Sequence, residues 1–132
     1  MRKWTLIQRH MLAIMEEAAE EDLSVLINTL GGHTGLPDEL DDVGAALMSL
    51  LKSDLVEIAR SRDPSSLHWI PVPTTGALAL LADIRSYFLW SSVDHLWKWS
   101  SKESRAQVLL TNKGQRAAHQ VLSEDGWFPG NR

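Results

Sequence analysis

The chain has 132 residues, and its hydrophobic content of 44% is enough to bury a core without a metal or a disulfide. It contains no cysteine, which excludes disulfide bonds, thiolate metal sites and thiol nucleophiles. The net charge of −4 is uneven, because residues 1–51 hold nine acidic and three basic residues, whereas residues 52–132 hold eight acidic and ten basic ones. A basic surface is therefore expected only from the second part of the chain.

The sequence predicts neither export nor membrane insertion. Gln8, Arg9 and His10 interrupt the first apolar residues before these reach the length of a signal peptide. The richest apolar stretch, residues 77–99, contains charged residues that hydrocarbon disfavours. We therefore expect a single domain over residues 1–132, located in the cytoplasm and not in a membrane.

Periodic apolar residues predict two helices in the first part of the chain. They recur from Trp4 to Ala18 at the spacing of one helix face, so a helix is expected over residues 4–19. The same spacing continues over residues 23–30 and ends at Gly31–Gly32. This second segment is predicted to form a separate helix or a continuation of the first.

A pair of helices and a hairpin are predicted over residues 34–72. Pro37 is placed to open a short helix, because its missing N–H costs little in the first turn. An amphipathic pattern then predicts a longer helix over residues 41–52. Residues 55–60 and 67–72 favour strands and flank a turn, which predicts a hairpin whose outer strand ends at Pro71.

The second part of the chain is predicted to be a long helix followed by a strand and a final helix. Residues 76–99 return to helical spacing, with a bend or a break at Ser91–Ser92. Residues 107–110 predict a short strand, and Thr111 is placed to cap a helix that runs to about Ser123. The tail residues Trp127 and Phe128 are expected to pack back on the domain. The positions expected to be buried within residues 76–99 are Leu80, Leu81, Ile84, Phe88, Val93, Leu96 and Trp97.

Two segments resemble a known family. Val43–Ile58 reads VGAALMSLLKSDLVEI, which looks like a recognition helix followed by the first strand of a wing. Val108–Arg116 reads VLLTNKGQR and is similar to the LT-x-x-G-R segment that closes the wing or opens the next helix. With its order of helix, short helix, amphipathic helix and hairpin, the chain resembles winged helix-turn-helix proteins, especially bacterial regulators of the MarR and PadR kind.

The resemblance implies a mainly α fold with a small β-hairpin or sheet (α+β). It places the helix-turn-helix and the wing over residues 34–72, and the final strand and helix over residues 107–123. In compact members of the family the LT-x-x-G segment follows the wing directly, whereas here about 35 residues separate the first hairpin from Val108. Residues 76–99 are therefore interpreted as an inserted aromatic-rich helix.

By this resemblance the chain is expected to bind double-stranded DNA as a transcriptional regulator, without a cofactor. The start of the predicted reading helix is acidic, and its expected solvent-side residues Gly44, Ala45, Met48 and Ser49 offer few donors to base edges. Contacts with DNA are therefore expected from the wing and from nearby basic residues. The candidate DNA-binding residues are Lys52, Arg60, Arg62, Lys113 and Arg116.

A protein-interaction module is the alternative hypothesis, because residues 16–42 are acidic and aromatic residues are favoured as interface anchors. A homodimer through the inserted helix is expected, unless its rings complete the core of one chain or line a pocket for an apolar ligand. Clustered basic residues favour DNA, whereas exposed apolar side chains between Trp90 and Trp99 favour a protein or small ligand. The candidate interface residues are Tyr87, Phe88, Trp90, Trp97 and Trp99.

No sequence motif predicts catalysis or metal binding. The chain has no G-x-S-x-G elbow, no phosphate-binding glycine loop and no dinucleotide fingerprint. Its five histidines lie far apart, without the spacing of a metal site. We therefore expect a protein that is not an enzyme and that holds no metal.

Overall fold

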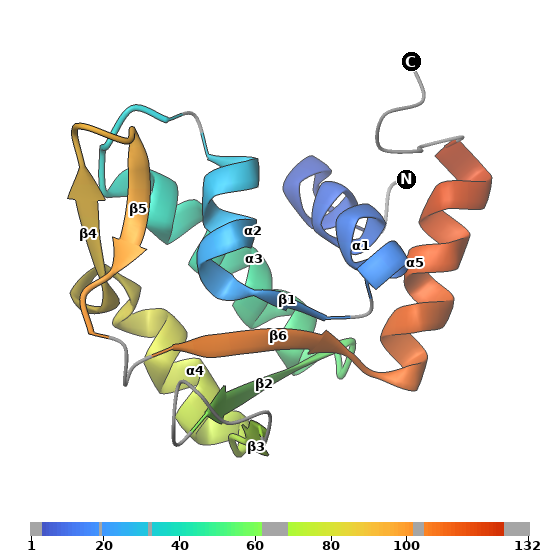
Figure 1. Cartoon of the computed structure of the whole chain (residues 1–132). Helices are drawn as coiled ribbons and strands as arrows, with labels where there is room; N and C mark the ends of the chain where they lie inside the picture. Colours follow the sequence, from blue (N-terminus) through green and yellow to red (C-terminus); the bar gives the residue numbers. More distant parts are fainter. Residues whose placement is uncertain (1–3, 19, 32, 62–68, 102–104, 126–132) are drawn as a thin grey trace.

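The computed structural model describes residues 4–18, 20–31, 33–61, 69–101 and 105–125. These form a mixed α+β fold, in which helices surround a small antiparallel sheet and a separate β-hairpin (Figure 1). The helices are α1 (Leu6–Ala18), α2 (Leu23–Leu30), α3 (Asp38–Lys52), α4 (Thr74–Ala82), the 3-10 helix η1 (Ile84–Tyr87) and α5 (Asn112–Asp125). The strands are β1 (Glu20–Asp22), β2 (Val56–Ser61), β3 (Trp69–Pro71), β4 (Phe88–Ser91), β5 (Leu96–Trp99) and β6 (Ala106–Leu110). None of the helices in these ranges is long and apolar enough to cross a membrane.

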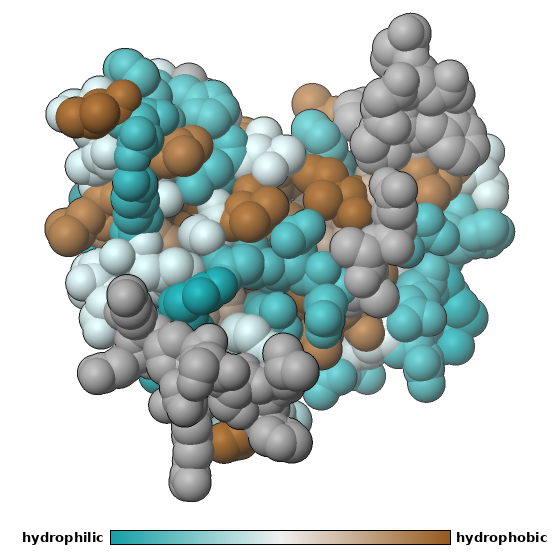
Figure 2. All heavy atoms as spheres, viewed as in Figure 1, coloured by the Kyte–Doolittle hydropathy of each residue, from teal (hydrophilic) through white to brown (hydrophobic). Residues whose placement is uncertain are grey.

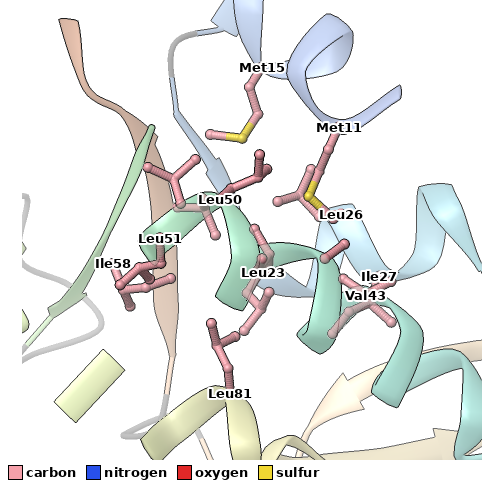
Figure 3. Packing of buried hydrophobic residues seen from close by; sticks show 14 of the residues in the cluster. Met11, Met15, Leu23, Leu26, Ile27, Val43, Leu50, Leu51, Ile58 and Leu81 are labelled. Carbon is pink, nitrogen blue, oxygen red and sulfur yellow. The ribbon is translucent and has the colours of Figure 1, made fainter. Parts of the chain in front are cut away.

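The apolar faces of α1, α2 and α3 form the centre of the core. Met11 and Met15 of α1 are fully buried, and Figure 3 shows them pointing toward Leu26 and Leu50. Burying one such side chain stabilises the fold by roughly 1.5–3 kcal/mol. The two helices predicted for the first part of the chain are confirmed, and they are separate because β1 lies between them.

The larger sheet has the strand order β1-β6-β2-β3, and each neighbouring pair is antiparallel. The predicted hairpin is confirmed by the pairing of β2 with β3, in which Arg60 lies opposite Ile70. Most of its turn, residues 62–66, lies outside the described residues. The predicted strand over residues 107–110 is also confirmed, as β6, and it lies along the other side of β2 with Val108 opposite Ile58. Segments that are distant in the sequence therefore form the centre of the sheet.

The expected short helix at Pro37 and the helix over residues 41–52 are wrong as two elements, because α3 is continuous from Asp38. No glycine or proline interrupts the chain between Asp38 and Val43. Leu40, Val43 and Leu47 are all buried, and their spacing places them on one face of a single helix. Helix α3 therefore begins directly after Pro37, with no separate short helix before it.

The predicted helix over residues 76–99 is also wrong beyond its first third. Helix α4 ends at Ala82, η1 follows, and β4 and β5 pair as an antiparallel hairpin. The pairs Phe88–Trp99 and Trp90–Trp97 lie opposite each other across this hairpin. Cross-strand aromatic pairs of this kind stabilise a hairpin. The turn of the hairpin contains His95, which has a φ of 54°. The alternation of side chains therefore has the period of a strand and not that of a helix.

Helix α5 returns the end of the described chain to its beginning, since it lies beside α1 (Figure 1). Its start after Thr111 confirms the predicted cap, because the Thr111 hydroxyl accepts a hydrogen bond of 2.9 Å from the Gly114 N–H. Trp127 and Phe128, which were expected to pack back on the domain, lie outside the described residues.

Candidate functional site

The N-terminal end of α3 is paired with an arginine from the segment that follows α4. Arg85 Nη2 and Nε donate to the two carboxylate oxygens of Asp41 at 2.5 and 3.0 Å, and Nη2 lies 3.5 Å from Asp38. The hydrogen bond from Arg85 holds the pKa of Asp41 below its usual value. The acids at the start of α3 are thus partly neutralised within the chain itself.

One flank of α3 is covered by α4 and η1. A Cβ atom at Gly44 would lie 3.2 Å from the carbonyl oxygen of Leu81 and 3.4 Å from the side chain of Ile84. The expectation that Gly44 and Met48 face solvent is therefore wrong: Gly44 is buried and Met48 is half-buried. Helix α4 and η1 can approach α3 this closely because Gly44 has no side chain.

The exposed part of α3 is a narrow stripe that is acidic at its start. Asp38, Asp42, Ala45, Ser49 and Lys52 are exposed and follow the helical repeat. Ala45 and Ser49 also line a groove of about 500 Å³ between α1 and α3. This stripe has one basic side chain, and that side chain is at its C-terminal end.

The structure brings together three of the candidate DNA-binding residues. Lys52 is exposed at the end of α3, and Lys113 Nζ donates to the carbonyl oxygen of the next residue, Ser53, at 3.0 Å. Arg116 is exposed on α5, three residues after Lys113 and on the same side of that helix. With a rise of 1.5 Å per residue, Lys52 lies about 21 Å along α3 from Asp38.

Of the other two candidate DNA-binding residues, Arg60 is not part of this group. Arg60 pairs with Ala106, at the opposite end of β2 from Lys52. Its guanidinium carbon lies 5.4 Å from the centre of the Tyr87 ring, so the cation packs on the inserted segment. Arg62 lies outside the described residues.

The candidate interface rings are buried or half-buried, and four of them pack in pairs. The centres of Phe88 and Trp99 lie 4.3 Å apart, and those of Trp90 and Trp97 lie 5.3 Å apart. Phe88 and Trp97 are buried, and Trp90, Trp99 and Tyr87 are half-buried. These rings therefore attach the hairpin to the rest of the domain.

Polar contacts from α2, α3 and their connection hold the inner side of the hairpin. Glu39 accepts hydrogen bonds from Trp97 Nε1 at 2.8 Å, from the Thr34 N–H at 2.6 Å and from the Thr34 hydroxyl at 2.5 Å. Burial raises the pKa of Glu39, but the hydrogen bonds from Thr34 and Trp97 outweigh it and lower the pKa overall. Asn28 accepts from the Trp97 N–H at 2.8 Å and donates to the Trp97 carbonyl at 2.9 Å. The outer edge of β5 is thus closed by a side chain.

The opposite face of the hairpin is apolar and exposed. Leu89 is 62% exposed, Val93 is 86% exposed and Leu96 is 36% exposed. These are three of the seven large hydrophobic residues that are exposed in the described part of the chain. Figure 2 shows hydrophobic side chains on the surface over the hairpin, beside hydrophilic ones. We call Leu89, Val93 and Leu96 the hairpin face.

Sequence reasoning missed the hairpin face because it assigned Val93 and Leu96 to the buried side of a helix. Leu80, Leu81, Ile84, Phe88 and Trp97 are buried as predicted. The signal that identifies the other face is the alternation of aromatic residues with Leu89 and Lys98, which has a period of two. Comparison of the chain with family models, with curated proteins and with solved structures found no match.

Proposed function

We propose that this chain is a winged-helix domain that acts as a protein-interaction module, with the hairpin face as its docking surface. The observation that carries the proposal is the placement of residues 74–99. Their first half covers α3, because the Leu81 carbonyl packs against Gly44 and Arg85 binds Asp41. Their second half exposes Leu89, Val93 and Leu96. The same segment thus covers the helix expected to read DNA and presents an apolar surface.

The strand order supports the winged-helix part of the proposal. Strand β6 lies directly beside β2, and the residues LTNKG run from its end into α5. The antiparallel pair of β2 and β6 supports the interpretation of these two strands as a wing, with residues 69–101 lying between them in the sequence. Because α3 is a single helix, we propose α2 and α3 as the helix-turn-helix of this interpretation, which extends the range expected from residue 34 back to Leu23.

The charge on α3 supports a partner other than DNA. A reading helix places its N-terminal half in the major groove, where Arg, Lys, Asn and Gln donate to base edges. Here that half exposes Asp38 and Asp42, which phosphates repel, and Arg85 already pairs with Asp41. The first exposed basic residue of α3 is Lys52, at the far end of the helix.

The hairpin face has the chemistry of a protein-binding surface. Its apolar residues lie beside the ion pair of Lys98 with Asp94, so an apolar centre is bordered by charged groups. Asp94 accepts a hydrogen bond from Lys98, which lowers its pKa. Covering Leu89 and Val93 would contribute favourable free energy to binding, because each exposes apolar area to water.

DNA binding is the second candidate function, and the proximity of Lys52 and Lys113 supports it. Arg116 extends this basic group along α5. Such a group would contact phosphates from the end of α3 without reading bases, so it predicts binding with little sequence preference.

Fluorescence anisotropy with labelled duplex DNA distinguishes the two candidates. We expect no saturable binding by the purified chain at low salt. Saturable binding that weakens steeply with salt, and that weakens further in Lys52→Gln and Lys113→Gln, would instead support DNA binding. Each lysine that contacts a phosphate contributes about one unit to the salt slope. Lys98→Gln is the matched control, since Lys98 lies on the hairpin.

Affinity capture from an extract of the source cells tests the docking surface. The bait is the wild-type chain, the Leu89→Glu variant or the Leu6→Glu variant. Leu6 is the matched control because it is 70% exposed and belongs to α1. Helix α1 lies away from the hairpin (Figure 1). We expect the wild type and Leu6→Glu to retain proteins that Leu89→Glu does not retain. Identical retention by all three baits would contradict the proposal.

A further inference from the structure

The outer edge of β4 is an unpaired strand edge. Strand β4 pairs with β5 on one side, and no other described strand lies beside it. Figure 1 shows β4 at the margin of the molecule, with β5 between it and α2. The edge is therefore open to a further strand.

The register identifies which backbone groups face outward from this edge. The N–H and carbonyl of Trp97 bind Asn28, so they point away from β4. Trp90 lies opposite Trp97, and in an antiparallel pair the outward groups of opposite residues point in opposite directions. The N–H and C=O groups of Trp90 therefore point out of the free edge, as do those of Phe88 two residues earlier.

The composition of β4 differs from that of the other sheet edges. Strand β1 is Glu-Glu-Asp, and its charges discourage pairing with another strand. Strand β3 has only three residues and ends in Pro71, which cannot donate to a ladder. Strand β4 is Phe-Leu-Trp-Ser, which has strong strand propensity and neither charge nor proline. It lacks the features by which an unpaired edge is protected.

We propose that β4 pairs with β4 of a second copy of this chain, in antiparallel orientation about a twofold axis at Leu89. This inference rests on the proposed function and names its partner. Phe88 of each copy then exchanges hydrogen bonds with Trp90 of the other, and the hairpins join into one four-stranded sheet. The two Leu89 side chains face each other at the axis, because an isologous contact brings a residue against its own copy.

The charges around β4 favour this antiparallel pairing of two copies. Arg85 precedes the strand and Asp94 follows it. The side chain of each is about half exposed, while Arg85 also pairs with Asp41 and Asp94 with Lys98 within the chain. Antiparallel pairing brings the basic end of one strand toward the acidic end of the other, whereas parallel pairing would bring like charges together. An apolar residue at the axis and opposite charges at the ends make β4 complementary to itself.

Analytical ultracentrifugation over a range of protein concentrations tests the association. We expect reversible dimerisation of the wild type, and a dissociation constant raised by more than about tenfold in Leu89→Glu, since the substitution places two carboxylates at the axis. Within one chain the new carboxylate lies opposite Lys98, so the hairpin itself is retained. Leu6→Glu is expected to dimerise as the wild type does. A wild type that remains monomeric, or a dimer unaffected by Leu89→Glu, overturns the proposal.

Mixing two variants tests the register. Leu89→Glu and Leu89→Lys are each expected to be monomeric at concentrations where the wild type dimerises, and their equimolar mixture is expected to form a heterodimer. Failure of the mixture to associate would exclude a twofold axis at Leu89.

Hydrogen exchange of the wild-type amides, measured by NMR at low and high protein concentration, avoids any substitution. The Phe88 and Trp90 amides are expected to exchange more slowly at high concentration. The Leu89 amide is the internal control, because it faces β5 in either state. Equal exchange of all these amides at both concentrations would overturn the self-pairing but not the proposed function, which the capture experiment tests independently.

Discussion

At the scale of single residues, the start of α5 is fixed to the backbone that leads into β2. The Thr111 hydroxyl donates to the carbonyl of Asp54 at 2.7 Å, and the Thr111 N–H donates to the carbonyl of Leu55 at 3.1 Å. A Cβ atom at Gly114 would lie only 1.9 Å from the same Leu55 oxygen. Glycine at this position is therefore required by a close approach of two backbones.

Substitution Gly114→Ala is expected to destabilise the domain. Alanine is the better helix former by about 1 kcal/mol, but its Cβ would displace the start of α5 from Leu55. We expect a net loss of about 2 kcal/mol or more in the free energy of unfolding, measured with urea. Gln115→Ala, one residue later and exposed, is expected to change the free energy by less than about 0.5 kcal/mol. Equal stability of the two variants would contradict this account of α5.

At the scale of elements, the hairpin is docked by a small number of specific contacts. Trp90 packs against Gly35, which has a φ of 78° and leaves no space for a side chain, since a Cβ there would lie 2.7 Å from the ring. Asn28 binds the backbone of Trp97 as a neighbouring strand would. The docking of the hairpin therefore depends on α2 and on the connection between α2 and α3.

Substitution Asn28→Asp is expected to loosen the hairpin. Aspartate retains an acceptor for the Trp97 N–H but loses the donor to the Trp97 carbonyl and places a negative oxygen against it. The loss is expected to be about 1–3 kcal/mol, with a change in tryptophan fluorescence. Thr29→Asp, which adds the same charge to the same end of α2 at an exposed position, is the control. If both variants lose the same stability, the cause is the helix dipole and not the contact with Trp97.

At the scale of the whole molecule, α3 is the element on which the proposed function depends, because it supports the segment that carries the hairpin face. Its buried face packs in the core, and its flank carries α4 and η1. Glu39, near its start, joins the helix to the hairpin through Trp97. Protonation of this carboxylate therefore affects the contact between two parts of the domain.

The pH dependence of stability follows from the lowered pKa of Glu39. A carboxyl group whose pKa is lower in the folded state contributes stability above its unfolded value of 4.5, and that contribution is lost as the pH falls through the folded value. Glu39→Gln is expected to cost about 1–2 kcal/mol near neutral pH, because one of its hydrogen bonds loses its acceptor. The difference from the wild type is expected to shrink below pH 4.5, as measured by urea unfolding at several pH values. Glu57→Gln, at an exposed carboxylate of β2, is expected to show no such difference.

The sequence by itself determined the elements that depend on local contacts. Helices α1, α2 and α5, the main part of α3 and the pairing of β2 with β3 follow from apolar spacing, from the cap at Thr111 and from strand propensity. Mixed α+β architecture follows from the same features. These are properties of neighbouring residues, so they do not require knowledge of distant partners.

Only the tertiary structure decided the features that depend on distant partners. The acidic strand β1 has little strand propensity of its own and forms because β6 offers an edge to it. Residues 88–99 have apolar residues at helical spacing, but pairing of Trp90 with Trp97 and docking on Gly35 favour a hairpin. The burial of Gly44 and the exposure of Leu89 and Val93 follow from that choice, because a strand places alternate residues on opposite faces. The surface proposed to bind a partner is thus set by long-range packing, because the period-two alternation in this segment competes with an apolar spacing that favours a helix.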